Sequence, residues 1–73
     1  MDFELKIHKK QRTMYIPKTL HNILGLEVTA IPNMNSVYIF PKTLNKKDAV
    51  RSLIVIKKEL EYQVELQGRN KKT

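Results

Sequence analysis

The stretch Thr13–Leu26, TMYIPKTLHNILGL, decides how this chain folds. Met14 and Ile16 fall on one face of a short strand, and Pro17 ends that strand. Because proline lacks an N–H group and its φ is fixed near the helical value, it suits the first turn of a helix. Gly25 then supplies the left-handed conformation with which helices commonly stop. The stretch predicts a strand, a short helix and a stop.

The predicted helix has about two turns, which is too short to be stable alone. Its apolar residues must therefore dock on a sheet formed by the segments on either side. These residues are Leu20, Ile23, Leu24 and Leu26.

Upstream, Phe3–His8 alternates between apolar and polar residues, with Leu5 and Ile7 on the apolar face, which predicts a second half-buried strand. The residues between the two strands, Lys9–Arg12, include no apolar side chain and hold three like charges. Like charges held close together repel each other unless an anion is nearby. We therefore expect an anion-binding loop, and the alternative is a solvated turn that protects a sheet edge.

Downstream, Val28–Ile31 and Val37–Phe40 are predicted strands, and a proline follows each of them. Asn33–Ser36 should form the turn between them, because asparagine tolerates left-handed backbone angles at hairpin tips. The strand Val37–Phe40 is apolar on both faces. One face should meet the core, and the other should meet a partner chain or the following helix.

The last third of the chain predicts one long helix. Asn45 can cap it, with Asp48 as a capping-box partner, and no proline or glycine follows until Gly68, the expected stop. One stripe at helical spacing consists of Ala49, Leu53, Ile56, Leu60 and Val64. The expected domains are 1–44 for the strand-rich part, 45–67 for the helix and 68–73 for a disordered basic tail.

Composition limits what the chain can be. Its 73 residues suit one domain, and a domain this small buries little surface. With no cysteine, it can form neither a disulfide nor a cysteine zinc site, and we expect no metal and no cofactor. Oligomerisation is the remaining way to stabilise such a fold, so we expect a homodimer.

The charge and the apolar pattern limit the function. A net charge of +7 favours a polyanionic partner, most commonly nucleic acid. The sequence contains no apolar run that would span a membrane and no signal peptide, so we expect a cytoplasmic protein. His8 and His21 lie in different predicted elements, and no catalytic constellation is recognisable, so we expect no enzyme activity.

The order of these elements resembles the SpoVT/AbrB family of swapped-hairpin DNA-binding domains, which includes transition-state regulators and MazE-type antitoxins. The resemblance covers Phe3 to about Pro41. The family pattern, approximately Ile-Pro-x-x-Leu-x-x-x-Leu-Gly-Ile/Leu, is matched by Ile16, Pro17, Leu20, Leu24, Gly25 and Leu26. The resemblance implies an α+β fold with a mainly β core, in which two chains interleave into one swapped-hairpin β-barrel with a short helix, followed here by the C-terminal helix.

Two departures from the family pattern are visible. Many members carry a Gly-Asp pair before the third strand, whereas here Leu26 runs directly into Glu27. Many also have an arginine beside a glycine just before the second strand. This chain has Arg12 near that place and no glycine.

The resemblance also implies that the loop between the first two strands faces DNA. Most of its cations would bind phosphates, and Arg12 is the residue expected to read a base edge. The implied DNA-binding residues are Lys6, His8, Lys9, Lys10, Arg12 and Lys18. Tyr15, Lys47, Arg51 and Lys58 are possible additional contacts. The expected dimer and core residues are Leu5, Ile7, Met14, Ile16, Leu20, Leu24, Val37, Ile39, Leu53, Ile56 and Leu60.

These observations predict a nucleoid-associated regulator of transcription that binds double-stranded DNA, sequence-specifically or semi-specifically, as a homodimer or a higher oligomer. The C-terminal helix, which the family core does not explain, leaves three interpretations open. It packs across the barrel or against its dimer mate, it adds a second DNA contact through its cations, or it binds a partner protein. The last interpretation gives the alternative function, an antitoxin or another protein–protein interaction module.

Overall fold

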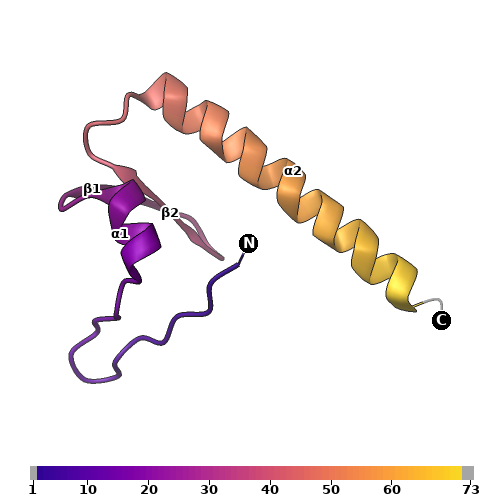
Figure 1. Cartoon of the computed structure of the whole chain (residues 1–73), viewed down its shortest axis with the longest axis horizontal. Helices are drawn as coiled ribbons and strands as arrows, with labels where there is room; N and C mark the ends of the chain where they lie inside the picture. The colour runs from indigo at the N-terminus through magenta and orange to yellow at the C-terminus, as the bar shows by residue number, and fades with distance from the viewer. Residues whose placement is uncertain (1, 72–73) are drawn as a thin grey trace. The chain divides into compact units, whose positions relative to one another are not determined.

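A computed structural model describes residues 2–71, and their side chains as far as Arg69. The elements follow in the order α1 (Lys18–Leu24), β1 (Val28–Pro32), β2 (Val37–Pro41) and α2 (Lys46–Lys71) (Figure 1). The chain divides into an N-terminal unit, Met1–Lys42, and a C-terminal unit, Thr43–Thr73. The fold is therefore a small α+β fold, as expected, with one hairpin, one short helix and one long helix.

Pro17 and Gly25 bracket α1 as predicted. Pro17 is the residue just before the first helical turn, with φ −56° and ψ 150°, so it precedes the helix without occupying its first position. At the other end, the Gly25 N–H donates to the His21 carbonyl at 2.8 Å. The expected left-handed helical conformation of Gly25 is wrong, because its φ of 75° is combined with a ψ of −152°, which lies outside that region; essentially only glycine adopts this combination.

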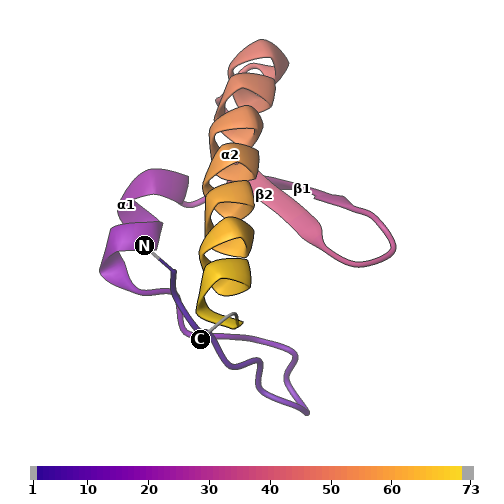
Figure 2. The ribbon, with the colours of Figure 1, turned by 90° about the vertical axis from the view of Figure 1, so that its right-hand side faces the viewer.

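The strands β1 and β2 form an antiparallel hairpin whose register runs from Val28 opposite Pro41 to Pro32 opposite Val37 (Figure 2). The turn is closed by the side chain of Asn33. Its Oδ1 accepts the backbone N–H groups of Asn35 and Ser36, each at 2.9 Å. The expected left-handed asparagine is absent, since Arg12 is the one non-glycine residue with positive φ in the described part of the chain.

Phe40 forms the centre of the N-terminal unit. It is the one residue of this unit, among those described, that is buried, with 5% of its surface exposed. The ring of Tyr38 lies on the same side of β2, and its centroid is 5.1 Å from that of the Phe40 ring. Thr29 is opposite Phe40 in the hairpin. Because α1 lies against β2, the short helix docks on the hairpin as its length requires.

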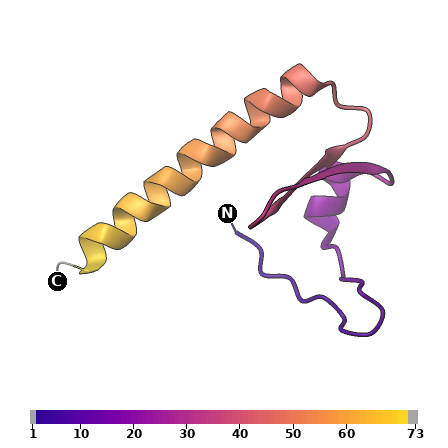
Figure 3. The ribbon, with the colours of Figure 1, turned by 180° about the vertical axis from the view of Figure 1, so that it is seen from behind.

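The segments before α1 differ from the prediction. The expected strands over 3–8 and 13–16 are reduced to a single antiparallel bridge between Ile7 and Met14, and Figure 3 draws both segments as extended coil. The apolar faces of these segments have few neighbours to pack against. The side chain of Ile7, for example, is 67% exposed. A lone two-stranded ribbon is at best marginally stable in water, so the prediction of two strands is wrong for a single chain.

The start of α2 confirms the predicted cap. Asn45 Oδ1 accepts the Asp48 N–H at 2.9 Å, and the Asn45 side-chain amide donates to Asp48 Oδ2 at 3.0 Å. The predicted stop at Gly68 is wrong, because the helix continues to Lys71. A glycine inside a helix costs only about 1 kcal/mol relative to alanine, and an Arg69–Glu65 ion pair spans this last part of the helix. Residues 69–71 of the expected tail are thus helical, and residues 72–73 lie outside the described chain.

Most of the expected core is not buried in one chain. Phe40 and Ala49, both absent from that set, are the buried hydrophobic residues of the described chain. The half-buried members of the expected set are Leu5, Ile16, Leu20 and Leu24, and the exposed members are Ile7, Met14, Val37, Ile39, Leu53, Ile56 and Leu60. The physical reason is length, since units this short have few neighbouring elements to cover an apolar face. As dimer contacts, these residues remain a prediction.

The two glycines give a matched test of the α1 stop. Gly25→Ala should lower the free energy of unfolding by about 1–2 kcal/mol, because alanine cannot adopt the Gly25 backbone conformation without strain. Gly68→Ala should raise it by about 0.5–1 kcal/mol, because Gly68 lies in a helix with open space around its Cα. Urea unfolding followed by circular dichroism measures both, and changes of equal sign would contradict this assignment.

Candidate nucleic-acid interface

The basic loop, Lys9–Arg12, is closed by backbone hydrogen bonds at its neck, which we define as the flanking residues His8 and Thr13. The His8 carbonyl accepts the Arg12 N–H at 2.7 Å, and the His8 N–H donates to the Thr13 carbonyl. The bridge between Ile7 and Met14 follows directly below. The four loop residues are therefore held at both ends, although the segments that lead to them form no sheet.

The side chain of His8 also supports the loop. Its Nδ1 atom accepts the Gln11 N–H at 3.2 Å. An imidazole nitrogen that accepts a hydrogen bond carries no hydrogen, so the neutral ring holds its hydrogen on Nε2. His8 is exposed, and its Nε2–H can donate to a phosphate oxygen while Nδ1 keeps the loop in place. Sequence patterns give no signal for this contribution of Gln11, which acts through its backbone.

Arg12 has a strained backbone. Its φ is 56°, in the left-handed region that costs an L-residue roughly 1–2 kcal/mol. It is the last residue of the loop, after the turn at residues 9–11, and glycine would be free of this strain there. The chain thus keeps a guanidinium group at a position that favours glycine. Strained residues of this kind cluster at functional sites.

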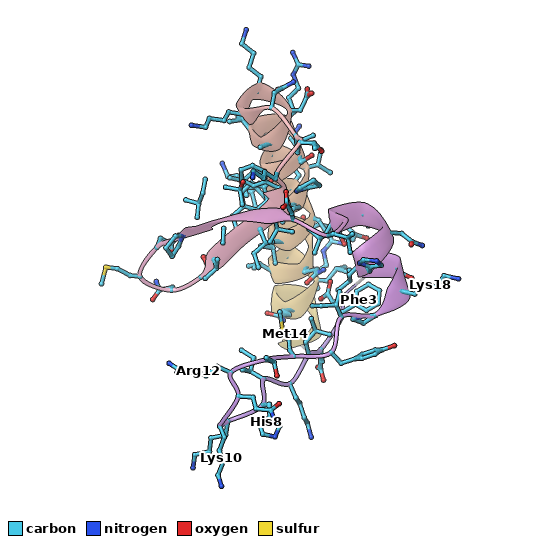
Figure 4. All side chains as sticks on the ribbon, turned by 90° about the vertical axis from the view of Figure 1, so that its left-hand side faces the viewer. Phe3, His8, Lys10, Arg12, Met14 and Lys18 are labelled. Atoms are coloured by element: carbon cyan, nitrogen blue, oxygen red, sulfur yellow. The ribbon has the colours of Figure 1, made fainter. Side chains whose placement is uncertain are left out.

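Among the described residues, the loop cations Lys9, Lys10 and Arg12 form no ion pair. From Leu5 to Leu26 the sequence contains no acidic residue. In the described chain, ion pairs form elsewhere, at Lys42–Glu27, Arg51–Asp48 and Arg69–Glu65. Figure 4 shows His8, Lys10 and Arg12 pointing outward from the loop in different directions. Such a tip carries a positive potential that attracts polyanions.

The structure brings together some of the expected DNA-binding residues and separates others. His8, Lys9, Lys10 and Arg12 share the loop and its neck, and Lys6 is exposed on the segment that leads to it. Lys18 begins α1, and Figure 4 shows it apart from the loop tip. The Tyr15 side chain, 82% exposed, lies one residue beyond the bridge, so its ring is accessible to a ligand beside the loop.

The possible contacts on α2 form a separate set within the C-terminal unit. At about 100° per residue, Lys47, Arg51 and Lys58 fall on one side of the helix. All three are exposed. Arg51 Nη1 lies 3.4 Å from Asp48 Oδ1, and an exposed pair of this kind contributes little. Arg51 can therefore exchange this contact for a phosphate.

Other kinds of site find no support in residues 2–71. No group of three or more histidine, cysteine, aspartate or glutamate side chains in that range could hold a metal ion. A search of the helices in the same range finds none that is both long and apolar enough to cross a membrane.

Comparisons with protein-family models, with curated proteins and with solved structures find no match for this chain.

Substitutions at Arg12 test the backbone strain. Arg12→Gly should be more stable than Arg12→Ala by about 1 kcal/mol, because both remove the guanidinium and only glycine adopts a positive φ without cost. The measurement is the urea midpoint of the two variants under identical conditions. Equal midpoints would show that the loop relaxes around alanine and that position 12 carries no strain.

Proposed function

We propose that this protein is a homodimeric regulator of transcription that binds double-stranded DNA through its basic loop. It acts without a cofactor, by occupying DNA in the cytoplasm and so changing access to it. The observation that carries the proposal is a backbone-closed loop whose cations form no ion pair in the described chain. The resemblance of Ile16–Leu26 and its flanking segments to SpoVT/AbrB domains supports the same function.

The loop suits duplex DNA in its chemistry. Lys9 and Lys10 are point charges on flexible stems, which suit phosphates whatever the sequence. Arg12 has a planar fork of donors that matches the two acceptors of a guanine edge in the major groove. The closed neck fixes the backbone from which Arg12 projects. Phosphate contacts thus set affinity, and Arg12 contributes sequence preference.

The proposal of a homodimer rests on exposed apolar surface. The N-terminal unit spans Met1–Lys42, about the size below which domains usually need disulfides, metals or oligomerisation. Its predicted strand residues Ile7, Met14 and Ile39 are exposed. A second copy can pair with the segments over 3–8 and 13–16 and convert them into strands. Interleaving of this kind gives the swapped-hairpin barrel that the resemblance implies, with both basic loops in one particle.

Charge removal at the loop should weaken DNA binding without loosening the loop. Lys10→Ala combined with Arg12→Gly should lower affinity for a short duplex at least about tenfold near 0.1 M salt. It should also reduce the slope of log affinity against log salt by about 2, because the dimer loses the Lys10 phosphate contact from each of its two loops and each such contact contributes about 0.9. Fluorescence anisotropy over a series of salt concentrations gives both quantities.

The matched control is Lys71→Ala combined with Lys72→Ala, which removes the same charge from the other end of the sequence. This control should keep most of the affinity. If both double variants lost affinity equally, binding would follow from net charge alone and the loop would not be the DNA-binding face.

Molar mass in solution tests the homodimer. Light scattering coupled to size exclusion should give at least twice the chain mass of 8.6 kDa, because one chain leaves its apolar faces uncovered. Ile7→Glu should shift the mass toward the monomer, since it places a charge in the proposed strand pairing. Lys9→Glu, a control two residues away in the solvated loop, should leave the mass unchanged. A monomeric wild-type chain at all concentrations would contradict the homodimer.

A further inference from the structure

The long helix α2 carries an apolar surface that nothing in its own unit covers. This surface, which we call the α2 patch, consists of Leu53, Ile56, Leu60 and Val64. These side chains are 44–66% exposed. Lys57 and Glu61 complete the lining of the same hollow. The patch covers three turns of helix, and these two charges are the polar groups beside it.

The geometry of a helix places both charges on one border of the α2 patch. At about 100° per residue, the four apolar residues fall within an arc of about 80°, and Lys57 and Glu61 follow each other along one side of it. They are four residues apart, yet they form no ion pair in the described chain. The opposite border carries the uncharged Ser52 and Gln63, and Glu59 lies as far outside this border as Glu61 lies outside the first, although it does not line the hollow.

We propose that the α2 patch binds the α2 patch of a second copy, with the two helices antiparallel. The patch and the charged pair have nearly the same midpoint along the helix, close to Glu59. A two-fold axis through that midpoint brings the same border of both helices together and reverses their order. Lys57 of one copy then faces Glu61 of the other, twice, while Leu53 packs near Val64 across the axis.

A parallel pair makes poorer use of the same surface. Its two-fold axis runs along the helices and brings the charged border of one helix against the uncharged border of the other. Lys57 would then face the border of Ser52 and Gln63, with Glu59 farther out, and Glu61 would face no cation. The antiparallel arrangement is therefore the one in which Lys57 and Glu61, the two charges that line the hollow, pair with each other across the axis.

The size of the α2 patch defines its role. Three turns of helix extend about 17 Å, and a helix pair of that length buries less than the roughly 800 Å² per partner of a stable standard interface. The pairing is therefore a second contact that adds to association through the N-terminal unit. In this respect it rests on the proposed homodimer.

Disulfide trapping tests the pairing cleanly because the chain has no cysteine of its own. Leu53→Cys and Val64→Cys chains are prepared separately, refolded together and oxidised in a glutathione buffer. The expected product is the mixed 53–64 disulfide. Disulfides between two copies of position 53 should be rare, because an antiparallel pair separates them by about 17 Å and a disulfide needs Cα atoms within about 7 Å.

Val55→Cys is the matched control, because Val55 is exposed and lies on the far side of α2. It should cross-link to neither partner, and circular dichroism should show native helix content in every variant. Two results would overturn the proposal. Disulfides between two copies of position 53 would show a parallel pair, and no disulfide above the Val55→Cys background would show that another segment or protein covers the patch.

Charge reversal tests the facing of Lys57 and Glu61. Adding Lys57→Glu to both cysteine chains should reduce the mixed disulfide several-fold, since glutamates then face each other. Pairing Leu53→Cys/Lys57→Glu with Val64→Cys/Glu61→Lys should restore it, although each helix alone carries like charges. No recovery in this mixture would overturn the proposed facing. The molar mass of the unmodified chain separates the two failures, because a monomer contradicts the homodimer, whereas a dimer without the disulfide contradicts only the helix pairing.

Discussion

The burial of Phe40 is the contact on which the N-terminal unit depends. Its side chain is covered while most other apolar side chains of the unit remain exposed. The hairpin register places Thr29 across from it, and α1 lies against the strand that carries it. A helix of two turns has no stability of its own. The short helix α1, between Pro17 and Gly25, is therefore stable only because it docks on β2. This helix also connects the basic loop to the hairpin.

The same shortage of buried surface links structure to function. A unit that leaves apolar side chains such as Ile7 and Ile39 in water gains more by association than by further folding of one chain. We infer that a second copy supplies the missing neighbours. Association would place two basic loops in one particle and so double the phosphate contacts available to DNA. Stability and affinity would then share one cause, the interleaving of two chains.

The basic loop combines two unfavourable free-energy contributions, charge repulsion and backbone strain. Cations at Lys9, Lys10 and Arg12 repel one another, and Arg12 also holds a positive φ. The hydrogen bonds at the neck and from Gln11 to His8 offset part of these costs. A bound polyanion would remove the repulsion, so the loop is favourable mainly in the presence of its proposed ligand. This is the pattern expected of the proposed binding site.

The sequence by itself determined the local features: the Pro17 and Gly25 limits of α1, the hairpin from Val28 to Pro41 and the Asn45 cap of α2. Each depends on one or two residues whose backbone preferences are strong. Only the tertiary structure decided the rest. Alternation predicted strands before α1, but strands need a neighbour and one chain provides none. Gly68 predicted a stop, but one glycine costs a long helix too little to end it. The backbone conformation of Arg12 and the hydrogen bond from Gln11 to the His8 side chain depend on how the loop closes. That closure arises from hydrogen bonds between residues in three dimensions, which a sequence pattern does not predict.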